Sequence, residues 1–255
     1  MPSGPVRRSI RGLSFLWRIG LRAFSFQSFF ATTLAGNGRP STLRRRIHHP
    51  RGAGRPMPSV WCALRTFPAH AQEMGGEALP EPLFFLKPWA ALARPPAGCE
   101  IEIPEGVHHE VELVLEIRDG LHRIGIGLDL TDRELQSDAK VTGMPWTRAK
   151  GFPNSAILGE LVEAPVGLDS MRIELAINGE PRQEAAISQM SFSPLELLES
   201  LSMWAPLEDG DLLFCGTPAG VGPIHAGDYL CARLLREDGT VLSEIEITAA
   251  PIRAD

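Results

Sequence analysis

The chain has 255 residues, of which 44% are hydrophobic and 22% charged, a composition that predicts an ordinary globular protein of one or two domains. No run of eighteen apolar residues occurs in the sequence, so no membrane-spanning helix and no membrane partner are predicted. The four cysteines have no metal-ligand or CxxC spacing, which is typical of reduced thiols in a cytosol-like compartment.

The net charge of −6 is unevenly distributed along the chain. Residues 1–56 contain eleven arginines, no lysine and no acidic residue, whereas residues 57–255 contain the other 14 basic residues and all 31 acidic ones. An acidic domain of this kind argues against nucleic acid as a partner. It is compatible with carboxylates that surround a metal ion.

The arginine-rich segment 1–56 is predicted to lie outside the folded domain, which then comprises residues 57–255. Arg-rich, Ser-containing and acid-free sequence is typical of an organellar transit peptide, and Arg11, Arg18 and Arg22 would share one helix face. The alternative, which we prefer, is an incorrectly assigned start with Met57 as the true first residue. The first interpretation predicts a protein of the mitochondrial matrix and the second a cytoplasmic protein.

From Met57 onward the sequence predicts many short strands and few helices. In chain order we expect a strand at 60–64, a helical turn at 68–74, and strands at 83–86, 109–117 and 124–130. A capping box at 131–134 begins a helix that runs to about residue 140. There follow a hairpin (171–177 and 182–187, around Asn178-Gly179), a helix (194–203), a strand (212–215), a Gly/Pro loop (216–223) and a second hairpin (229–235 and 241–247). This order indicates an α+β fold that is mainly β.

Two carboxylates lie two residues apart in the predicted strand 109–117, at Glu110 and Glu112. Residues i and i+2 of a strand share a face about 7 Å apart, so the two charges repel each other unless a cation lies between them. Asp129, in an otherwise apolar strand, also needs a partner or a metal. Three such carboxylates suit a hard cation, Mg²⁺ or Mn²⁺, that keeps open positions for water and substrate. The alternative for Glu110 and Glu112 is a pair of solvated surface acids.

His108 and His109 directly precede this pair. Adjacent residues of a strand face opposite ways, so the two histidines are not expected to bind one zinc ion together. We interpret His109 as a packed or hydrogen-bonded residue.

Four segments, in order, carry a resemblance to a known family: HHEVEL, GLDLTDRELQ, GMPWTRAKGF and LLFCGTPAGVGP. Across residues 62–247 the sequence resembles the fumarylacetoacetate hydrolase family, and most of all its acylpyruvase and oxaloacetate decarboxylase branch. The resemblance implies a mixed β-roll with few short helices, a homodimer, and an active site beneath a small lid.

The resemblance also implies roles for individual residues. Glu110, Glu112 and Asp129 match the metal ligands, and Lys150 matches the active-site lysine. The matched substrate-binding residues are Arg65, Arg133, Gln136, Gly216 and Thr217, the last two in the loop that receives a substrate carboxylate. Read without the resemblance, Lys150 and Gln136 would be surface residues, and Arg133 an i, i+3 partner on its own helix.

His70 and Glu73 are three residues apart, so one helical turn would place them on the same face. In such a dyad the carboxylate orients the imidazole, which takes a proton from water. The resemblance places this dyad in the lid of the family's hydrolytic members, although Thr66 and Phe67 stand where Asn-Tyr is common.

The resemblance predicts a metal-dependent hydrolase that cleaves a C–C bond in a small 2,4-dioxo acid, such as an acylpyruvate or fumarylpyruvate, to pyruvate and a carboxylic acid. His70, oriented by Glu73, would activate water, and Lys150 would stabilise the oxyanion or deliver a proton. An alternative on the same site is decarboxylation or tautomerisation of oxaloacetate, or isomerisation of a hydroxy-diene dioate, none of which needs an attacking water. A third possibility is a non-catalytic family member.

Overall fold

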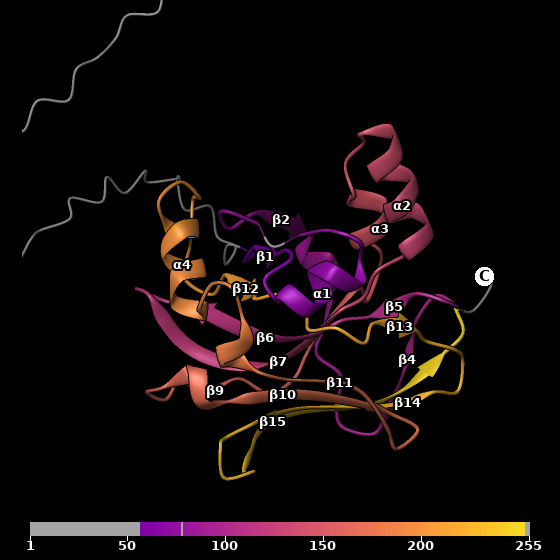
Figure 1. Cartoon of the computed structure of the whole chain (residues 1–255). Helices are drawn as coiled ribbons and strands as arrows, with labels where there is room; N and C mark the ends of the chain where they lie inside the picture. Colours follow the sequence, from indigo (N-terminus) through magenta and orange to yellow (C-terminus); the bar gives the residue numbers. More distant parts are fainter. Residues whose placement is uncertain (1–56, 78, 253–255) are drawn as a thin grey trace, which may run out of the picture. The chain divides into compact units, whose positions relative to one another are not determined.

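The structure is a computed structural model that describes residues 57–77 and 79–252, so the predicted extension 1–56 lies outside the described residues. Within the described part, the strands form an eight-stranded sheet, a five-stranded sheet and a two-stranded ribbon, accompanied by short helices (Figure 1). This arrangement confirms the prediction of an α+β fold that is mainly β. Among the described helices, none has the length and apolar character needed to cross a membrane.

The larger sheet carries the predicted metal ligands. Its strands follow the order β2 (Phe84–Lys87), β1 (Val60–Ala63), β12 (Leu212–Phe214), β6 (Val111–Ile117), β7 (Leu121–Asp129), β8 (Ala156–Leu158) and β3 (Leu92–Ala93), and β9 (Val162–Glu163) also pairs with β7. The β1–β12 and β3–β8 pairs are parallel, whereas the β6–β7 pair at the centre is antiparallel. The sheet is therefore mixed.

The smaller sheet has the order β11 (Glu180–Ala186), β10 (Arg172–Ile177), β14 (Tyr229–Leu235), β15 (Val241–Ala250) and β4 (Cys99–Glu102). The predicted hairpin between β10 and β11 is present, and Asn178 and Gly179 both have positive φ, as a type I′ turn requires. The ribbon pairs β5 (His108–His109) with β13 (Gly222–Pro223), which brings the Gly/Pro loop beside the start of β6.

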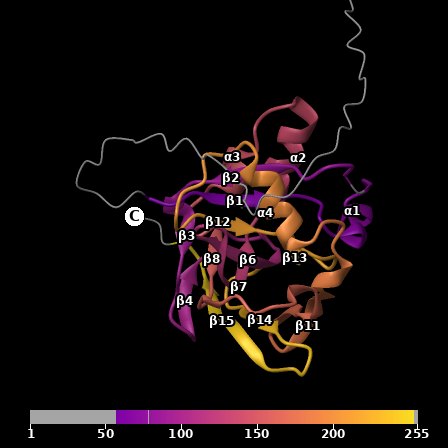
Figure 2. The ribbon, with the colours of Figure 1, turned by 90° about the vertical axis from the view of Figure 1, so that its left-hand side faces the viewer.

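The helices α1 (Pro68–Glu73), α2 (Arg133–Thr142), α3 (Thr147–Lys150) and α4 (Pro194–Ser202) are short, and three 3₁₀ turns span Trp89–Ala91, Leu168–Ser170 and Ile187–Gln189. In both views the smaller sheet lies beside β6 and β7, with β10 in contact with β6, and β14 and β15 in contact with β7 (Figure 2). The smaller sheet therefore covers one face of the central strands, whereas β12 and β1 continue the larger sheet at their edge.

Burial on both faces explains the composition of β6, all seven residues of which are buried. Leu113 and Leu115 belong to the core shared with the smaller sheet, whereas Val114, on the opposite face, packs in a second cluster with Phe214. At Gly127 of β7 an added Cβ would lie 2.5 Å from the Phe214 ring, so only glycine permits this packing. Glu112 shares the face of Val114 and is buried with it.

Three details differ from the predictions. The strand expected at 109–117 is interrupted at Glu110, because β5 leaves to pair with β13 before β6 begins. The cap of α2 is Asp132 rather than Thr131: the Asp132 carboxylate accepts the Leu135 N–H at 2.9 Å, while the Thr131 hydroxyl donates to the carbonyl of Asp129. The sequence analysis also missed several short elements, namely α3, β3, β4, β8 and β9.

Candidate metal centre

Three carboxylates converge where β6 and β7 meet. Glu110 directly precedes β6, Glu112 is its second residue, and Asp129 ends β7, where its N–H donates to the carbonyl of Glu110 at 2.8 Å. One ligand atom from each carboxylate lies within 4.8 Å of the other two. All three side chains are buried, so they are not solvated surface acids. The shared face predicted for Glu110 and Glu112 is present, and Asp129 joins them.

Two cations compensate part of this negative charge. The Lys150 ammonium, at the end of α3, donates to Glu110 Oε2 at 2.8 Å and to Asp129 Oδ2 at 2.7 Å, and Arg133 of α2 pairs with Glu110 Oε1. Burial alone would raise the pKa of Glu110, but the Lys150 and Arg133 charges outweigh it and hold that pKa at about 2. Burial likewise favours neutral Lys150, yet Asp129 and Glu110 raise its pKa above the ordinary value. Glu110 and Lys150 are therefore charged at neutral pH.

Glu112 is compensated less well. Its Oε2 accepts the N–H of Gly216 at 2.7 Å. Burial, followed by the charges of Asp129 and Glu110, raises the pKa of Glu112 well above its usual range, against the opposing effects of Lys150 and the Gly216 N–H. In the absence of a further cation, this carboxyl group tends to keep its proton.

Lys87 is a part of the site that the sequence analysis missed. Its ammonium donates to the carbonyls of Leu130, Lys150 and Ser155 at 3.0, 2.6 and 2.8 Å, and it also lies 2.7 Å from Asp129 Oδ1. The three protons of the ammonium are directed at the three carbonyls, so Oδ1 has a charge partner but accepts no hydrogen bond from a described residue. Lys87 is two residues from Phe85 in β2 and shares its face of the strand, but only the structure shows that this face is directed at the site.

This donor set fits a divalent cation. Glu112 is held in a place where burial and the charges of Asp129 and Glu110 disfavour its own charge. A cation between the carboxylates would offset this repulsion. Clustered carboxylate oxygens are the ligands that Mg²⁺ and Mn²⁺ prefer. Glu110, Glu112 and Asp129 would therefore hold such an ion.

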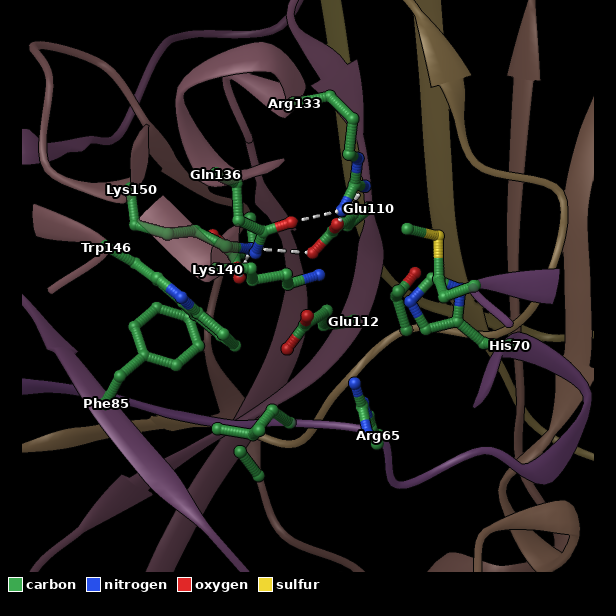
Figure 3. A pocket seen from close by; sticks show the side chains of 15 residues that line it. Arg65, His70, Phe85, Glu110, Glu112, Arg133, Gln136, Lys140, Trp146 and Lys150 are labelled. Atoms are coloured by element: carbon green, nitrogen blue, oxygen red, sulfur yellow. Dashed lines mark hydrogen bonds and ion pairs between the residues drawn. The ribbon is translucent and has the colours of Figure 1, made fainter. Parts of the chain in front are cut away.

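A pocket opens over the carboxylates (Figure 3). Its apolar wall includes Phe85 and Trp146, whose ring centroids are 6.1 Å apart. The charged and polar side chains that line it are Arg65, His70, Glu110, Glu112, Asp129, Arg133, Gln136, Lys140, Lys150 and Thr217. The pocket thus brings together nearly all the residues singled out in the sequence.

The predicted dyad is formed. His70 Nδ1 lies 3.0 Å from Glu73 Oε2, one turn along α1, and the His70 side chain lines the pocket. The second oxygen of Glu73 accepts the N–H of Gly220 at 2.9 Å. The same carboxylate therefore orients the imidazole and attaches α1 to the Gly/Pro loop.

Some of the predicted substrate-binding residues line the pocket, whereas Gly216 contacts the metal centre instead. Arg133 Nη1 donates to Gln136 Oε1 at 2.8 Å, so the i, i+3 contact exists, yet both side chains line the pocket and Gln136 is buried. Thr217 lines the pocket and accepts a hydrogen bond from Gln183, which leaves its hydroxyl proton available to a ligand. The N–H of Gly216 is directed at Glu112, so Gly216 positions a carboxylate of the centre.

His109 behaves as expected. It is buried, and its Nδ1 lies 2.9 Å from Gln183 Oε1, which also accepts the N–H of Val111. Gln183, from β11, thereby connects His109, the first residue of β6 and Thr217. His109 is confirmed as a hydrogen-bonded scaffold residue.

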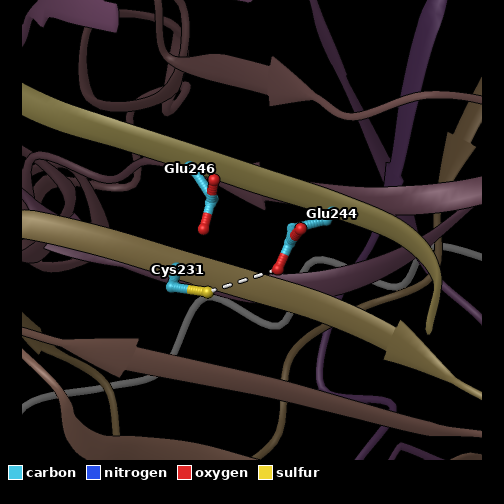
Figure 4. A group of neighbouring side chains, drawn as sticks. All are labelled: Cys231, Glu244 and Glu246. Carbon is cyan, nitrogen blue, oxygen red and sulfur yellow. Dashed lines mark hydrogen bonds between the residues drawn. The ribbon is translucent and has the colours of Figure 1, made fainter. Parts of the chain in front are cut away.

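A second group of metal-binding residue types lies on the smaller sheet. Atoms of Cys231, Glu244 and Glu246 approach within 4.8 Å of one another (Figure 4). Glu244 already pairs with Arg233, and the Cys231 thiol donates to it. This second group is only partly buried, whereas Glu110, Glu112 and Asp129 are all buried, so the carboxylates below the pocket are the stronger candidate.

Comparison with known proteins identifies the family of the chain. The family model described as "Fumarylacetoacetate (FAA) hydrolase C-terminal" matches residues 59–249. The mitochondrial oxaloacetate tautomerase of Arabidopsis thaliana is 36% identical over 207 residues, which cover 73% of this chain and 88% of that protein. Oxaloacetate tautomerase YcgM of Escherichia coli (strain K12) is 33% identical over 192 residues, 69% of this chain and 87% of that protein.

A solved structure of similar fold also points to this family. The fumarylpyruvate hydrolase from Pseudomonas aeruginosa, in complex with Mn²⁺ and pyruvate, aligns with a TM-score of 0.69 and 32% identity over 77% of this chain and 91% of that one. The residues matched by the family model include the part of the chain that builds the site. The chain therefore belongs to the fumarylacetoacetate hydrolase family.

Proposed function

We propose that this protein is a divalent-cation-dependent enzyme that interconverts the keto and enol forms of oxaloacetate. The observation that carries the proposal is the convergence of Glu110, Glu112 and Asp129 beside Lys150 at the base of a pocket. The relatives named oxaloacetate tautomerase support this reaction over the C–C hydrolysis that was our first expectation. The intact charge set argues against a non-catalytic member.

When bound, a divalent cation supplies Lewis-acid polarisation of a 2-keto oxygen. The residues of this chain supply the proton chemistry. Lys150 donates two of its protons to Glu110 and Asp129, so the third is available to stabilise negative charge that develops on the substrate oxygen. Thr217 can donate its hydroxyl proton to the substrate's 1-carboxylate.

His70 is positioned to move the carbon-bound proton. Its Nδ1 is held by Glu73, and its Nε2 makes no hydrogen bond with a described residue. Nε2 therefore can remove a proton from C3 of the keto form, and the proton then returns to the 2-oxygen to give the enol. The reverse sequence forms the ketone, so one base serves both directions.

A second candidate is the hydrolysis of an acylpyruvate to pyruvate and a carboxylic acid. The formed His70–Glu73 dyad favours it, since this arrangement also activates water, and the Pseudomonas aeruginosa neighbour is named fumarylpyruvate hydrolase. The dyad itself does not discriminate, because tautomerisation needs a base as well. The substrate test below separates the two reactions.

The experiment is to incubate the full chain with Mg²⁺ or Mn²⁺ and to follow the ultraviolet absorbance of the oxaloacetate enol. In parallel, pyruvate release from oxaloacetate, acetylpyruvate and fumarylpyruvate is measured with lactate dehydrogenase. We expect rapid equilibration of the enol, lost with EDTA and in Glu112→Gln, and slowed by His70→Ala. Activity that survives EDTA would contradict the metal requirement, and faster turnover of an acylpyruvate would make hydrolysis the main reaction.

The location and the assembly of the protein are also proposals. The Arabidopsis thaliana and Schizosaccharomyces pombe relatives are named as mitochondrial, which supports residues 1–56 as a transit peptide rather than an incorrectly assigned start. Mass spectrometry of the native N-terminus tests this, because a transit peptide predicts cleavage. Light scattering of the purified protein tests the homodimer.

A further inference from the structure

Two cations at the pocket have no carboxylate partner among the described residues. Arg133 and Lys150 pair with the carboxylates of the metal centre, whereas Arg65 and Lys140 form no ion pair or hydrogen bond with any described residue. Unpaired cations that face a pocket are candidates for binding an anionic ligand group.

Lys140 comes from the last turn of α2. Its Nζ lies 5.3 Å from the centroid of the Trp146 ring, and its side chain points into the pocket (Figure 3). Partial burial, and then the charges of Arg133 and Arg65, lower the pKa of Lys140. An anion placed between these cations would remove that repulsion.

Arg65 is held in an unusual backbone conformation. Its φ of +54° lies in the left-handed region, which non-glycine residues rarely adopt. Its guanidinium lies against Gly76, where an added Cβ would be 3.1 Å from Nη1, and the side chain points toward the pocket in Figure 3. The backbone of Gly76, just beyond α1, thus leaves room for this cation at the mouth of the pocket.

We propose that Lys140 and Arg65 bind the distal carboxylate of the substrate, so that the pocket takes 2-oxo dicarboxylates in preference to 2-oxo monocarboxylates. This inference rests on the proposed function for the position of the 2-oxo acid end of the substrate. The substrate's 1-carboxylate would lie at the metal centre and Thr217, and the distal carboxylate would lie between the two free cations. Phe85 and Trp146 form an apolar border to this region.

Binding of inert hydroxy acids tests the inference without turnover. (S)-Malate and (S)-lactate share the 2-hydroxy carboxylate end and differ by one distal carboxylate. Titration calorimetry with the Mg²⁺-loaded full chain should show that malate binds about ten- to a hundredfold more tightly than lactate, as expected for one charged, hydrogen-bonded pair. Lys140→Met keeps an aliphatic chain beside Trp146 and should reduce this malate-to-lactate affinity ratio about tenfold. Lys140→Arg should largely retain the ratio.

A matched control and a double variant sharpen the test. Arg148→Met removes one positive charge from the neighbouring helix α3, outside the pocket lining, and should leave the ratio unchanged. Arg65→Gln should also lower the ratio, and its effect should not add to that of Lys140→Met if both residues bind the same carboxylate. Thermal melting confirms that each variant is folded.

Three results would overturn the inference: equal binding of malate and lactate, no detectable malate binding at millimolar concentration, or an equal loss for both ligands in Lys140→Met. If the ratio behaves as expected but oxaloacetate is not tautomerised, the proposed function fails and the carboxylate site stands. If tautomerisation is found without a preference for malate, only the carboxylate site fails.

Discussion

Lys87 carries a positive charge into the interior, where its ammonium lies among three carbonyls and beside Asp129. Lys87→Met would remove a donor from the Leu130 carbonyl and the ion-pair partner of Asp129 Oδ1. The Lys150 and Ser155 carbonyls would each keep one other donor, and Asp129 would keep its pair with Lys150. We expect the free energy of unfolding to fall by about 3–5 kcal/mol. Urea denaturation in EDTA measures it.

The control is Arg148→Met, which removes an exposed charge and should change the free energy of unfolding by less than about 0.5 kcal/mol. An equally small effect of Lys87→Met would show that the buried ammonium does not stabilise the fold. Lys87 also shows a limit of prediction from sequence, because a lysine at the end of a four-residue strand is usually exposed.

Two features require glycine at position 216: its backbone conformation and its close approach to Thr66. It has a φ of +96°, and an added Cβ would lie 2.1 Å from Thr66 Oγ1, which itself donates to the carbonyl of Cys215. Gly216→Ala should therefore displace the N–H that holds Glu112 and weaken Mg²⁺ binding at least about tenfold. Calorimetric titration with Mg²⁺ measures this affinity.

Gly227→Ala is the matched control. Gly227 has a φ of +91° with nothing within 4 Å of an added Cβ, so this variant bears the backbone strain alone. It should lose about 1 kcal/mol of stability and keep its Mg²⁺ affinity. Equal Mg²⁺ affinities in the two variants would contradict a role for Gly216 in positioning Glu112.

Among the elements, the ten-residue helix α2 supplies three residues of the pocket lining from one of its faces: Arg133, Gln136 and Lys140. Its N-terminus depends on the Asp132 cap. Asp132→Ala should cost about 1 kcal/mol of stability and raise KM for oxaloacetate, since the first turn would fray. Steady-state kinetics and urea denaturation measure the two effects.

Ser193→Ala removes a comparable cap from α4, outside the pocket lining. A similar loss of stability with unchanged KM is the expected result for this control. If both variants raise KM equally, the effect of Asp132 is general destabilisation rather than loss of position at the site.

Elements with strong local sequence signals were the predictable ones. Asn178-Gly179 marks the turn between β10 and β11, and a proline after a capping serine marks the start of α4. The structure contains both elements. The short strands β3 and β8 have two and three residues, and their parallel pairing joins segments far apart in the chain. Neither periodicity nor turn residues encode such a contact. Lys150 was identified by resemblance, while its short helix α3 was not predicted.

At the scale of the molecule, ligand binding should be visible as stability. A metal that binds only the folded state at a hundred times its Kd adds about 2.7 kcal/mol, which raises Tm by several degrees. We expect this rise with Mg²⁺ or Mn²⁺ in thermal melting and not in Glu110→Gln, Glu112→Gln double variants. A full rise in the double variant would place the ion elsewhere.

The raised pKa of Glu112 adds a pH dependence. A carboxyl whose folded pKa is raised stabilises the metal-free fold below its ordinary pKa, and this contribution is lost as pH rises through the raised value. Metal binding in that window must displace the proton, so affinity should increase with pH. Calorimetric titration with Mg²⁺ in buffers of different ionisation enthalpy should show that a proton is released when the metal binds. Glu112→Gln should abolish this release. Unchanged proton release in the variant would assign the proton to another group.

The Glu73 carboxylate has one further consequence. One oxygen holds the His70 imidazole and the other holds the N–H of Gly220. If α1 moved away from the Gly/Pro loop, the same displacement would free the carboxylate to rotate and the imidazole would lose its fixed tautomer. The attachment of α1 to the loop and the orientation of the base thus depend on the same carboxylate, so neither can be lost without the other.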